Sequence, residues 1–219
     1  MEQLQQPKTF DLPARSAFFP IYLAIKRFTD ILGSLIGMIV LSPLFLVIAI
    51  LIVCEDGGPV FFSQKRVTKG GREFYMHKFR SMCVNAENML DDLQDENEMD
   101  GPVFKMKDDP RITKIGHFLR KSSLDELPQL WNVFVGEMSL VGPRPPLPEE
   151  VRHYTEYDMH RLDVTGGLTC YWQVSGRNNI GFEDWVELDL KYIREMSLWT
   201  DLKILLRTVK CVLTRDGAM

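Results

Sequence analysis

Two consecutive carboxylates, Asp125 and Glu126, are the residues of this sequence best suited to do chemistry. They follow Arg120 and precede Pro128. A helix that begins at Pro128 leaves both acids in the turn before it, because proline is favoured at the first helical position. Two carboxylates at that place, close to an arginine, suit a divalent cation and a phosphate. The arginine and the helix dipole would keep Asp125 ionised, as a nucleophile must be.

The same residues also have a purely structural interpretation. Ser123 and Glu126 stand at the spacing of a capping box, in which both side chains only satisfy backbone groups at a helix start. A helix capped by Ser123 would hold Pro128 in its interior, where the ring clashes with the carbonyl of Leu124. The two interpretations therefore predict different helix starts, at Ser123 or at Pro128.

Five further residues could bind phosphates or a nucleotide. Lys78 and Arg80 end the second strand of a predicted hairpin. Arg144 lies in a proline-rich loop, which would present its guanidinium at a low entropic cost. Gln173 and Arg177 belong to a polar turn that follows an aromatic pair. Each of these residues alone is ordinarily a surface group, so their assignment depends on whether the fold brings them together.

The longest apolar segment indicates where these residues work. Residues 31–54 include no charged side chain, and a helix of that length spans roughly 36 Å against about 30 Å of bilayer hydrocarbon. Pro43 lacks an amide donor, so the helix should kink or break there, and the Ser42 hydroxyl could satisfy the backbone group that is freed. Basic residues flank both ends, so the positive-inside rule does not place the ends on opposite sides. We expect a re-entrant helix broken at Ser42-Pro43 in preference to a single crossing.

Shorter elements surround the candidate residues. Residues 60–67 and 73–79 are rich in Val, Phe and Tyr, and Lys69-Gly70-Gly71 between them supplies the glycines of a tight reversal, which predicts a β-hairpin. Residues 84–97 are predicted to be helical. Residues 112–120 are predicted to form a short amphipathic element.

The clearest helix is predicted at 198–213. Its apolar residues recur at helical spacing, and Lys203, Arg207 and Lys210 fall off that stripe. The stripe could face a protein core, or it could lie at a membrane interface while the cations reach lipid phosphates. The pattern leaves both open. The stripe consists of Leu198, Leu202, Leu205, Leu206, Val209, Val212 and Leu213.

Composition narrows the class of protein. The 219 residues carry a net charge of −4, which argues against a nucleic-acid partner. Acidic residues gather between 87 and 100 without the spacing of metal ligands, so they predict a solvated helix end. The four cysteines are scattered, which predicts reduced thiols that serve packing: Cys54, Cys83, Cys170 and Cys211.

Taken in order, these segments resemble the bacterial sugar transferase family. The resemblance covers about residues 25–213. It departs from the family pattern at Gly166, where a proline is usual, and at Cys170, where a glycine is usual, and these changes bear on a turn near the site and on the choice of sugar. The segments that carry it are the proline-containing apolar stretch, FFSQKRVTKGGREFYMHKFRSM, DPRITKIGHFLRKSSLDELPQLWNV, GEMSLVGPRPPLP, WQVSGRN and LDLKYIREMSLWTDLKILLRTVKCVL.

The resemblance implies a monotopic polyprenyl-phosphate phosphoglycosyl transferase. Such an enzyme moves a sugar 1-phosphate from a UDP-sugar to undecaprenyl phosphate and releases UMP, by a ping-pong mechanism through a phosphosugar on Asp125. Mg²⁺ held by Asp125 and Glu126 would offset the diphosphate charge, and Glu126 would assist proton transfer. Arg120 and Arg144 would clamp phosphates. The expected partners are the UDP-sugar, undecaprenyl phosphate and membrane lipids, with no nucleic acid and with a homo-oligomer left open.

The expected fold is α+β. Residues 1–24 would form an interfacial segment, 25–56 the re-entrant membrane helix, and 57–219 a cytosolic catalytic domain. That domain would be compact and helical, with a small β-hairpin and interfacial amphipathic helices, on the cytoplasmic face of the bacterial inner membrane. The resemblance points to the short form of the family, reduced to its catalytic domain. Two alternatives are a catalytically inactive membrane-docked scaffold and a monotopic lipid-binding module without nucleotide chemistry.

Overall fold

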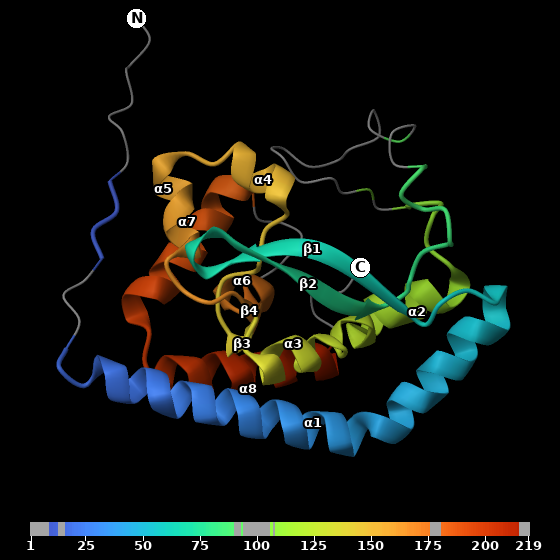
Figure 1. The fold of residues 1–219 in the computed structure, drawn as a ribbon, viewed down its shortest axis with the longest axis horizontal. Coiled ribbons are helices and arrows are strands. Elements are labelled where there is room, and N and C mark those ends of the chain that lie inside the picture. Colours follow the sequence, from blue (N-terminus) through green and yellow to red (C-terminus); the bar gives the residue numbers. More distant parts are fainter. Residues whose placement is uncertain are drawn as a thin grey trace, which may run out of the picture.

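A long helix, α1 (Phe19–Asp56), forms the base of the fold (Figure 1). The structure is a computed structural model that describes residues 9–12, 16–89, 93, 106, 108–175 and 181–214. The other helices and two small sheets lie along one side of α1 (Figure 1). Helices and small separate sheets in one chain confirm the predicted α+β class.

The apolar segment forms one continuous helix, and the break predicted at Ser42-Pro43 is wrong. α1 begins at Phe19 rather than at residue 25, and it continues through Pro43. The Ser42 Oγ donates a 2.8 Å hydrogen bond to the carbonyl of Ile39. That carbonyl is the group that would otherwise bond the missing amide of Pro43. Because the hydroxyl replaces the lost bond, the helix bends instead of ending (Figure 1).

The predicted β-hairpin is confirmed. β1 (Phe61–Thr68) pairs antiparallel with β2 (Arg72–Phe79), and the 3₁₀ turn η1 (Lys69–Gly71) joins them. Gly70 and Gly71 have φ of 68° and 79°, a left-handed backbone that glycine adopts without steric cost. Since side chains alternate along each strand, one face of the hairpin carries Phe62, Gln64 and Arg66 opposite Lys78, Met76 and Phe74.

Short elements complete the fold. β3 (Ser139–Val141) and β4 (Gly167–Thr169) pair in parallel, which we did not predict because strands of three residues leave no periodic signal. α2 (Lys114–Ser122) confirms the amphipathic element expected at 112–120. The other helices are η3 (Leu124–Glu126), α3 (Gln129–Val135), α4 (Pro148–Arg152), α5 (Glu156–Met159), η4 (His160–Leu162), α6 (Tyr171–Val174), α7 (Phe182–Glu195) and α8 (Leu198–Thr214).

One predicted helix is wrong where the structure describes it. Residues 84–89 form turns rather than the first part of a helix at 84–97. The rest of that segment lies outside the described residues apart from residue 93, and so does most of the acidic run at 87–100. All four cysteines are free thiols; Cys170 is buried as a packing residue, whereas Cys54 is exposed, so the prediction that it serves packing is wrong.

The C-terminal end of α1 is attached to the domain by apolar packing. Ile48 and Ile52 form a buried cluster with Phe79 at the end of β2 and Leu119 of α2. Phe45 packs edge-on against Phe79, with ring centroids 5.2 Å apart. Burial of several large apolar side chains in one cluster stabilises this attachment by several kcal/mol at about 1.5–3 kcal/mol per side chain.

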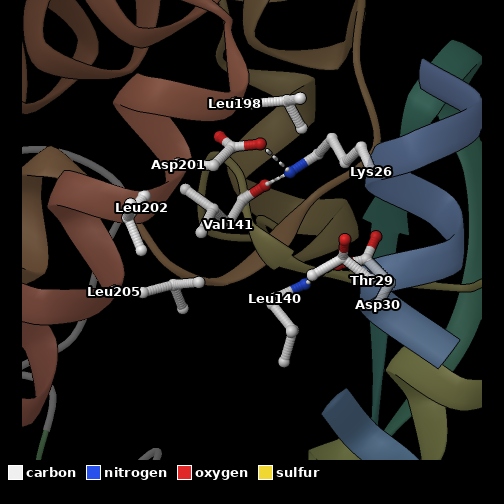
Figure 2. Close-up of a pocket in the computed structure, with 9 residues that line it drawn as sticks. All are labelled: Lys26, Thr29, Asp30, Leu140, Val141, Leu198, Asp201, Leu202 and Leu205. Carbon is white, nitrogen blue, oxygen red and sulfur yellow. Dashed lines mark hydrogen bonds and ion pairs between the residues drawn. The ribbon is translucent and has the colours of Figure 1, made fainter. Parts of the chain in front are cut away.

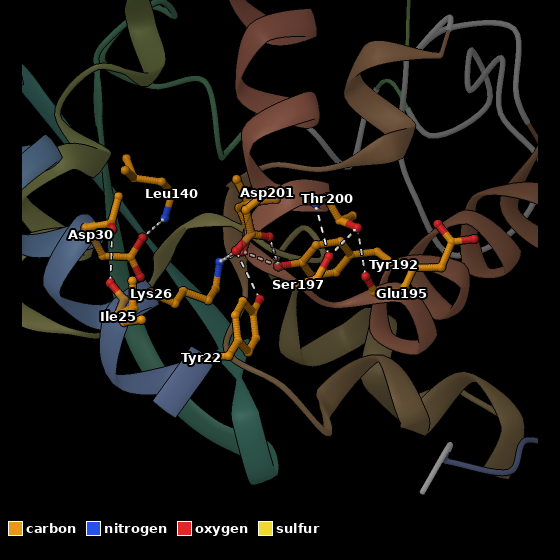
Figure 3. A network of polar contacts seen from close by, with 12 residues as sticks. Tyr22, Ile25, Lys26, Asp30, Leu140, Tyr192, Glu195, Ser197, Thr200 and Asp201 are labelled. Carbon is orange, nitrogen blue, oxygen red and sulfur yellow. Dashed lines mark hydrogen bonds and ion pairs between the residues drawn. The ribbon is translucent and has the colours of Figure 1, made fainter. Parts of the chain in front are cut away.

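Polar side chains attach the N-terminal half of α1 (Figure 3). Asp201 of α8 accepts hydrogen bonds at Oδ2 from the Tyr22 hydroxyl and the Lys26 ammonium, each 3.0 Å long. Its Oδ1 accepts a 2.8 Å bond from the Tyr192 hydroxyl of α7. Lys26 also donates to the carbonyl of Val141 at 2.8 Å. We call these five residues the Asp201 network.

Two more polar contacts continue this attachment toward the middle of α1. The guanidinium of Arg27 donates 2.7 Å hydrogen bonds to the carbonyls of Val133 and Phe134, which end α3. Asp30 accepts a 2.9 Å bond from the amide of Leu140 in β3. Both ends of α1 therefore contact the same domain.

Most of the apolar stripe of α8 points away from the protein core, and Leu205 is the member that packs against it. Leu202 and Leu206 are 45% and 62% exposed, whereas Ile204 on the opposite side of the helix is fully buried. The interpretation of this stripe as core-facing is therefore wrong. Lys203 lies over the exposed ring of Trp199, 5.2 Å from its centroid. The side chain of Leu213 lies outside the described residues.

Candidate active site

The Asp125–Glu126 pair lies in η3, between α2 and α3. Ser123 ends α2 with a left-handed backbone, φ 56°, and its side chain makes no capping hydrogen bond, so the capping-box interpretation is wrong. Pro128 is the residue that caps α3, which starts at Gln129. The proline thus marks the helix start, and both acids precede it as predicted.

Lys78 of β2 is the nearest charged partner of the two acids. Its ammonium lies 2.9 Å from Glu126 Oε1 and 4.0 Å from Asp125 Oδ2. Asp125 is only 8% exposed. Within the described part of the chain, no other residue donates a hydrogen bond to its carboxylate. The carboxylate is therefore largely buried, with the ammonium of Lys78 as its ion-pair partner and no hydrogen bond from another described residue.

Burial controls the protonation of Asp125. It raises the pKa of this carboxyl to about 6, and the charges of Lys78 and Arg120 only partly oppose the rise. We expected the arginine and the helix dipole to keep the acid ionised, but α3 begins four residues later and burial outweighs the arginine. At pH 7 about nine tenths of such a group is nevertheless ionised, one pH unit above its pKa.

Arg120 lies next to the acids and Arg80 does not. Arg120 donates a 3.0 Å hydrogen bond from Nε to the Ser81 hydroxyl, and its pKa is lowered by burial but supported by the charge of Asp125. Arg80 instead forms a bidentate ion pair with Asp56, the last residue of α1. A Cβ at position 58 would collide with that guanidinium, so a larger residue there would have to displace Arg80.

Arg144 belongs to a second group of residues. Its guanidinium carbon lies 5.3 Å from the ring centroid of Trp185, and Trp185 stacks on Trp172 at 4.5 Å. Gln173 follows Trp172 and is buried, with a long 3.5 Å bond from its amide to the Leu168 carbonyl. Arg177 lies outside the described residues. The predicted phosphate-binding residues thus divide between the Asp125–Glu126 pair and this aromatic group.

Sequence reasoning missed Arg66, which connects the two groups. It is buried in β1 and donates from Nη1 to the carbonyl of Pro145, 3.1 Å away and next to Arg144. Burial and the charge of Arg144 lower its pKa to about 9, while the charges of Glu150 and Glu126 oppose this. The hairpin alternation was a usable signal, because residues 66 and 78 occupy the same face.

Asp125 and Glu126 are the carboxylates that could hold Mg²⁺. The described residues contain no group of three or more His, Cys, Asp or Glu arranged for a metal ion. Mg²⁺ commonly takes one or two carboxylates and completes its six oxygen ligands with water and substrate phosphates. Two adjacent carboxylates therefore fit this ion.

A cavity of about 210 Å³ lies between α1, β3 and α8 (Figure 2). Of its three charged residues, Lys26 and Asp201 bond each other within the Asp201 network, and Asp30 accepts the amide of Leu140. None of the residues predicted to act on a substrate lines it. The cavity is therefore separate from the Asp125–Glu126 pair. Its apolar lining consists of Leu140, Val141, Leu198, Leu202 and Leu205.

Comparison with known proteins identifies a family and several relatives. The profile of the family described as "Bacterial sugar transferase" matches residues 21–215. The galactosyl transferase CpsE of Streptococcus agalactiae serotype III is 50% identical over 201 residues, which are 90% of this chain and 44% of that protein. The undecaprenyl-phosphate galactose phosphotransferase of Salmonella typhimurium is 44% identical over 89% of this chain and 41% of its own length.

A third relative matches almost end to end. The exopolysaccharide production protein ExoY of Sinorhizobium fredii is 39% identical over 206 residues, which are 92% of this chain and 91% of that protein. The chain thus spans less than half the length of the first two relatives and nine tenths of the third.

Proposed function

Because the chain belongs to the bacterial sugar transferase family, we propose that it transfers a sugar 1-phosphate from a UDP-sugar to undecaprenyl phosphate and releases UMP. The observation that carries this proposal is the carboxylate of Asp125, buried between Lys78 and Arg120 without a hydrogen bond from another described residue. The name of one relative includes undecaprenyl phosphate, and the names of two include galactose. UDP-galactose is therefore the first donor to test.

In the first half-reaction, Asp125 is the nucleophile. A carboxylate oxygen attacks the phosphorus that bears the sugar, and the bond from that phosphorus to the bridging oxygen breaks. UMP leaves with the bonding electron pair, and an acyl phosphate joins Asp125 to the sugar. Lys78 and Arg120 offset the charge that builds up on the phosphoryl oxygens.

In the second half-reaction, the acceptor replaces the enzyme. A phosphate oxygen of undecaprenyl phosphate attacks the same phosphorus, a new P–O–P bond forms, and the carboxylate of Asp125 is released. A dianionic acceptor needs no base, and a monoanionic one can lose its proton to Glu126. The products are the undecaprenyl-diphosphate sugar and the original enzyme.

Mg²⁺ is the cofactor that the site would use. Asp125 and Glu126 would hold it, and when bound it would neutralise part of the diphosphate charge. Lys78 contacts both acids, so its charge offsets part of the repulsion between the two adjacent carboxylates.

The attachment of α1 supports a re-entrant, monotopic topology at the cytoplasmic face of the bacterial inner membrane. Of the described helices, only α1 is long and apolar enough to cross a membrane. Lys26 near its start and Asp56 at its end both bond the same domain. A straight crossing would separate those two ends by a bilayer of about 30 Å. A bend at Pro43 lets both ends stay on the side of the domain.

The outward stripe of α8 supports an interfacial position for this helix. Leu206 and Val209 are exposed beside Trp199. Tryptophan favours the membrane–water interface, and lysines such as Lys203 can reach lipid phosphates while their stems cover apolar surface. α8 would then hold the catalytic domain against the leaflet in which undecaprenyl phosphate resides.

The two alternatives need none of the buried charges. A scaffold for other glycan enzymes, or a lipid-binding module, has no use for a carboxyl group beside Lys78 and Arg120 whose pKa is raised by burial. Such an arrangement lowers stability, and a catalytic role explains why it is present. The burial of Asp125 without a hydrogen bond from another described residue therefore favours the transferase.

Release of UMP tests the proposed activity. Full-length protein in lipid nanodiscs should release UMP from UDP-galactose or another UDP-sugar when undecaprenyl phosphate and Mg²⁺ are present. Without the acceptor, intact mass spectrometry should find the mass of a sugar phosphate on wild-type protein and none on Asp125→Asn. Adduct formation by the asparagine variant would exclude Asp125 as the nucleophile.

Cysteine labelling tests the topology. Single cysteines at positions 20 and 60, in a background without the four native thiols, should react with an impermeant maleimide from the same side of the membrane. Labelling of the two positions from opposite sides would exclude the re-entrant arrangement.

A further inference from the structure

We propose that Arg66 and Arg144 together bind the nucleotide phosphate of the donor, and that Glu150 is a positioning residue that holds Arg66 in place. This inference rests on the proposed function, because it takes the donor to be a nucleoside diphosphate sugar. It assigns the phosphate that leaves with UMP to residues separate from Asp125 and Glu126.

The backbone brings the two arginines together from distant parts of the chain. The amide of Val67 donates a 2.9 Å hydrogen bond to the carbonyl of Pro146. Arg66 donates from Nη1 to the neighbouring carbonyl of Pro145 at 3.1 Å. Strand β1 and the loop are thus joined at the two residues that follow Arg144, and the charge of Arg144 acts on the guanidinium of Arg66. Two rigid supports of this kind suit a site that must recognise a fixed anion.

Arg66 and Glu150 are buried, and each has side-chain atoms that form no hydrogen bond with the described residues. Arg66 is 4% exposed, and among the described residues its Nε has no hydrogen-bond acceptor. Glu150 is 1% exposed, its carboxylate lies 4.0 Å from Arg66 Nη1, and neither oxygen accepts a hydrogen bond from the described part of the chain. A buried donor without a partner is costly, so the Nε of Arg66 indicates a ligand that accepts its hydrogen bond, while the charge of Glu150 holds the guanidinium in place.

Like charge explains why that ligand is an anion. The charge of Arg144 lowers the pKa of Arg66, so the two cations repel each other in the free protein. Glu150 offsets one of them but does not approach closely enough for a hydrogen bond. A phosphate between the two guanidinium groups would relieve the repulsion and accept their forked N–H donors.

The hairpin fixes where this phosphate would lie relative to Asp125. Arg66 shares a face of the hairpin with Gln64, which accepts a 2.7 Å bond from Arg66 Nη2, and with Lys78. Lys78 pairs with Phe62, four residues before Arg66, so the two backbones lie about 14 Å apart along the sheet. Both side chains are long enough to reach into that interval. The sugar-bearing phosphate would contact Asp125 near Lys78, and the leaving phosphate would contact Arg66.

Product binding tests this proposal without relying on turnover. Isothermal titration calorimetry on full-length protein in nanodiscs would use UMP and uridine as ligands, with melting temperature as the control for folding. We expect Arg66→Lys, which keeps the charge and loses the fork, to weaken UMP binding about tenfold or more. Uridine binding and the melting temperature should stay within error. Arg152 is an exposed arginine on α4, so Arg152→Lys is the matched control and should change the affinity for neither UMP nor uridine.

Glu150 is tested through the steady-state kinetics. Glu150→Gln should raise KM for the UDP-sugar several-fold and leave KM for undecaprenyl phosphate and kcat unchanged, because it loosens only the donor's second phosphate site. Glu149→Gln, an exposed neighbour on the same helix, should leave all three constants unchanged. A purely structural role for Glu150 would instead lower the active fraction, and thus kcat, with both KM values kept.

The outcomes separate this inference from the proposed function. Wild-type binding of UMP together with equal binding by Arg66→Lys would overturn the inference and leave the transferase intact. Equal loss of UMP and uridine binding, with a lower melting temperature, would also overturn it, because the arginine would then only support the fold. If wild-type protein binds no UMP, both the donor class and this site are excluded.

Discussion

Asp125 and Asp201 are equally buried carboxylates with opposite roles. Each is 8% exposed. Asp201 accepts three hydrogen bonds, from Tyr22, Lys26 and Tyr192, whereas the ammonium of Lys78, 4.0 Å away, is the one ion-pair partner of Asp125 among the described residues. Burial is the same, so the number of donors distinguishes them. A carboxylate whose lone pairs are occupied holds elements together, and one whose lone pairs are open is available to attack a substrate.

The strongest test of this comparison replaces each aspartate by asparagine and compares the two rates of turnover. Asp125→Asn should lower UMP release at least about a thousandfold, because a neutral amide cannot act as the nucleophile. Asp201→Asn should leave turnover per folded molecule within about threefold, because its partners lie outside the reacting groups. Both rates are measured as UMP release at 25 °C and normalised to folded protein. A loss of turnover at Asp201 as large as that at Asp125 would refute the division of roles.

The pH dependence of turnover is the next effect in size. Asp125 must be ionised to attack, and its pKa is about 6. The rate of UMP release should therefore fall about tenfold for each pH unit below 6 and level off above pH 7. Stopped-flow measurement of the first half-reaction from pH 4.5 to 8 tests this. A rate that is flat down to pH 4.5 would show that burial does not raise the pKa of the Asp125 carboxyl.

The substitution Asp201→Asn should lower the stability of the protein, although it leaves turnover almost unchanged. Asp201→Asn leaves the partly buried ammonium of Lys26 without its counter-charge, which costs about 3 kcal/mol in typical buried pairs. The melting temperature in detergent should fall by several degrees. Asp184→Asn, an exposed carboxylate of α7, is the control and should melt like the wild type. An unchanged melting temperature for Asp201→Asn would mean that the network does not attach α1.

Asp125→Asn should stabilise the protein at neutral pH. The pKa of this acid is 3.8 when unperturbed and about 6 in the fold. The folded state therefore holds a proton that the unfolded chain releases, so stability falls as pH rises from about 4 to 6 and stays lower above that. Removing the charge should restore about 1–3 kcal/mol at pH 7.5 and almost nothing at pH 4. Thermal unfolding at both pH values is the measurement, and destabilisation at pH 7.5 would contradict it.

The sequence was most informative where partners are close along the chain. The hairpin follows from Gly70 and Gly71 between two strand-forming runs, and the start of α3 follows from Pro128. The Asp201 network had no such signal, because Tyr22 and Asp201 are 179 positions apart. Only the assembled fold decides whether a given carboxylate meets three donors or none.

The candidate site was predictable in part for the same reason. Asp125, Glu126 and Arg120 lie within one short segment, and the structure keeps them together with Lys78. Arg80 does not reach that neighbourhood, because it follows the last residue of β2 and pairs with Asp56 at the end of α1, whereas Lys78 within the strand meets the acids. The sequence offered no means to foresee that Glu150, on a separate helix, would be buried beside Arg66.

The smallest expected effect on stability is that of Ser42, whose hydroxyl replaces the amide donor that Pro43 lacks. Its hydroxyl bonds the Ile39 carbonyl that Pro43 leaves open, so Ser42→Ala should cost about 0.5–1 kcal/mol. In a Pro43→Ala background the restored amide of residue 43 bonds that carbonyl instead, and the serine should then contribute almost nothing. A double-mutant cycle by thermal unfolding in detergent measures this coupling. Equal costs in both backgrounds would mean that the hydroxyl does not compensate for the proline. The bend of α1 would then need another explanation.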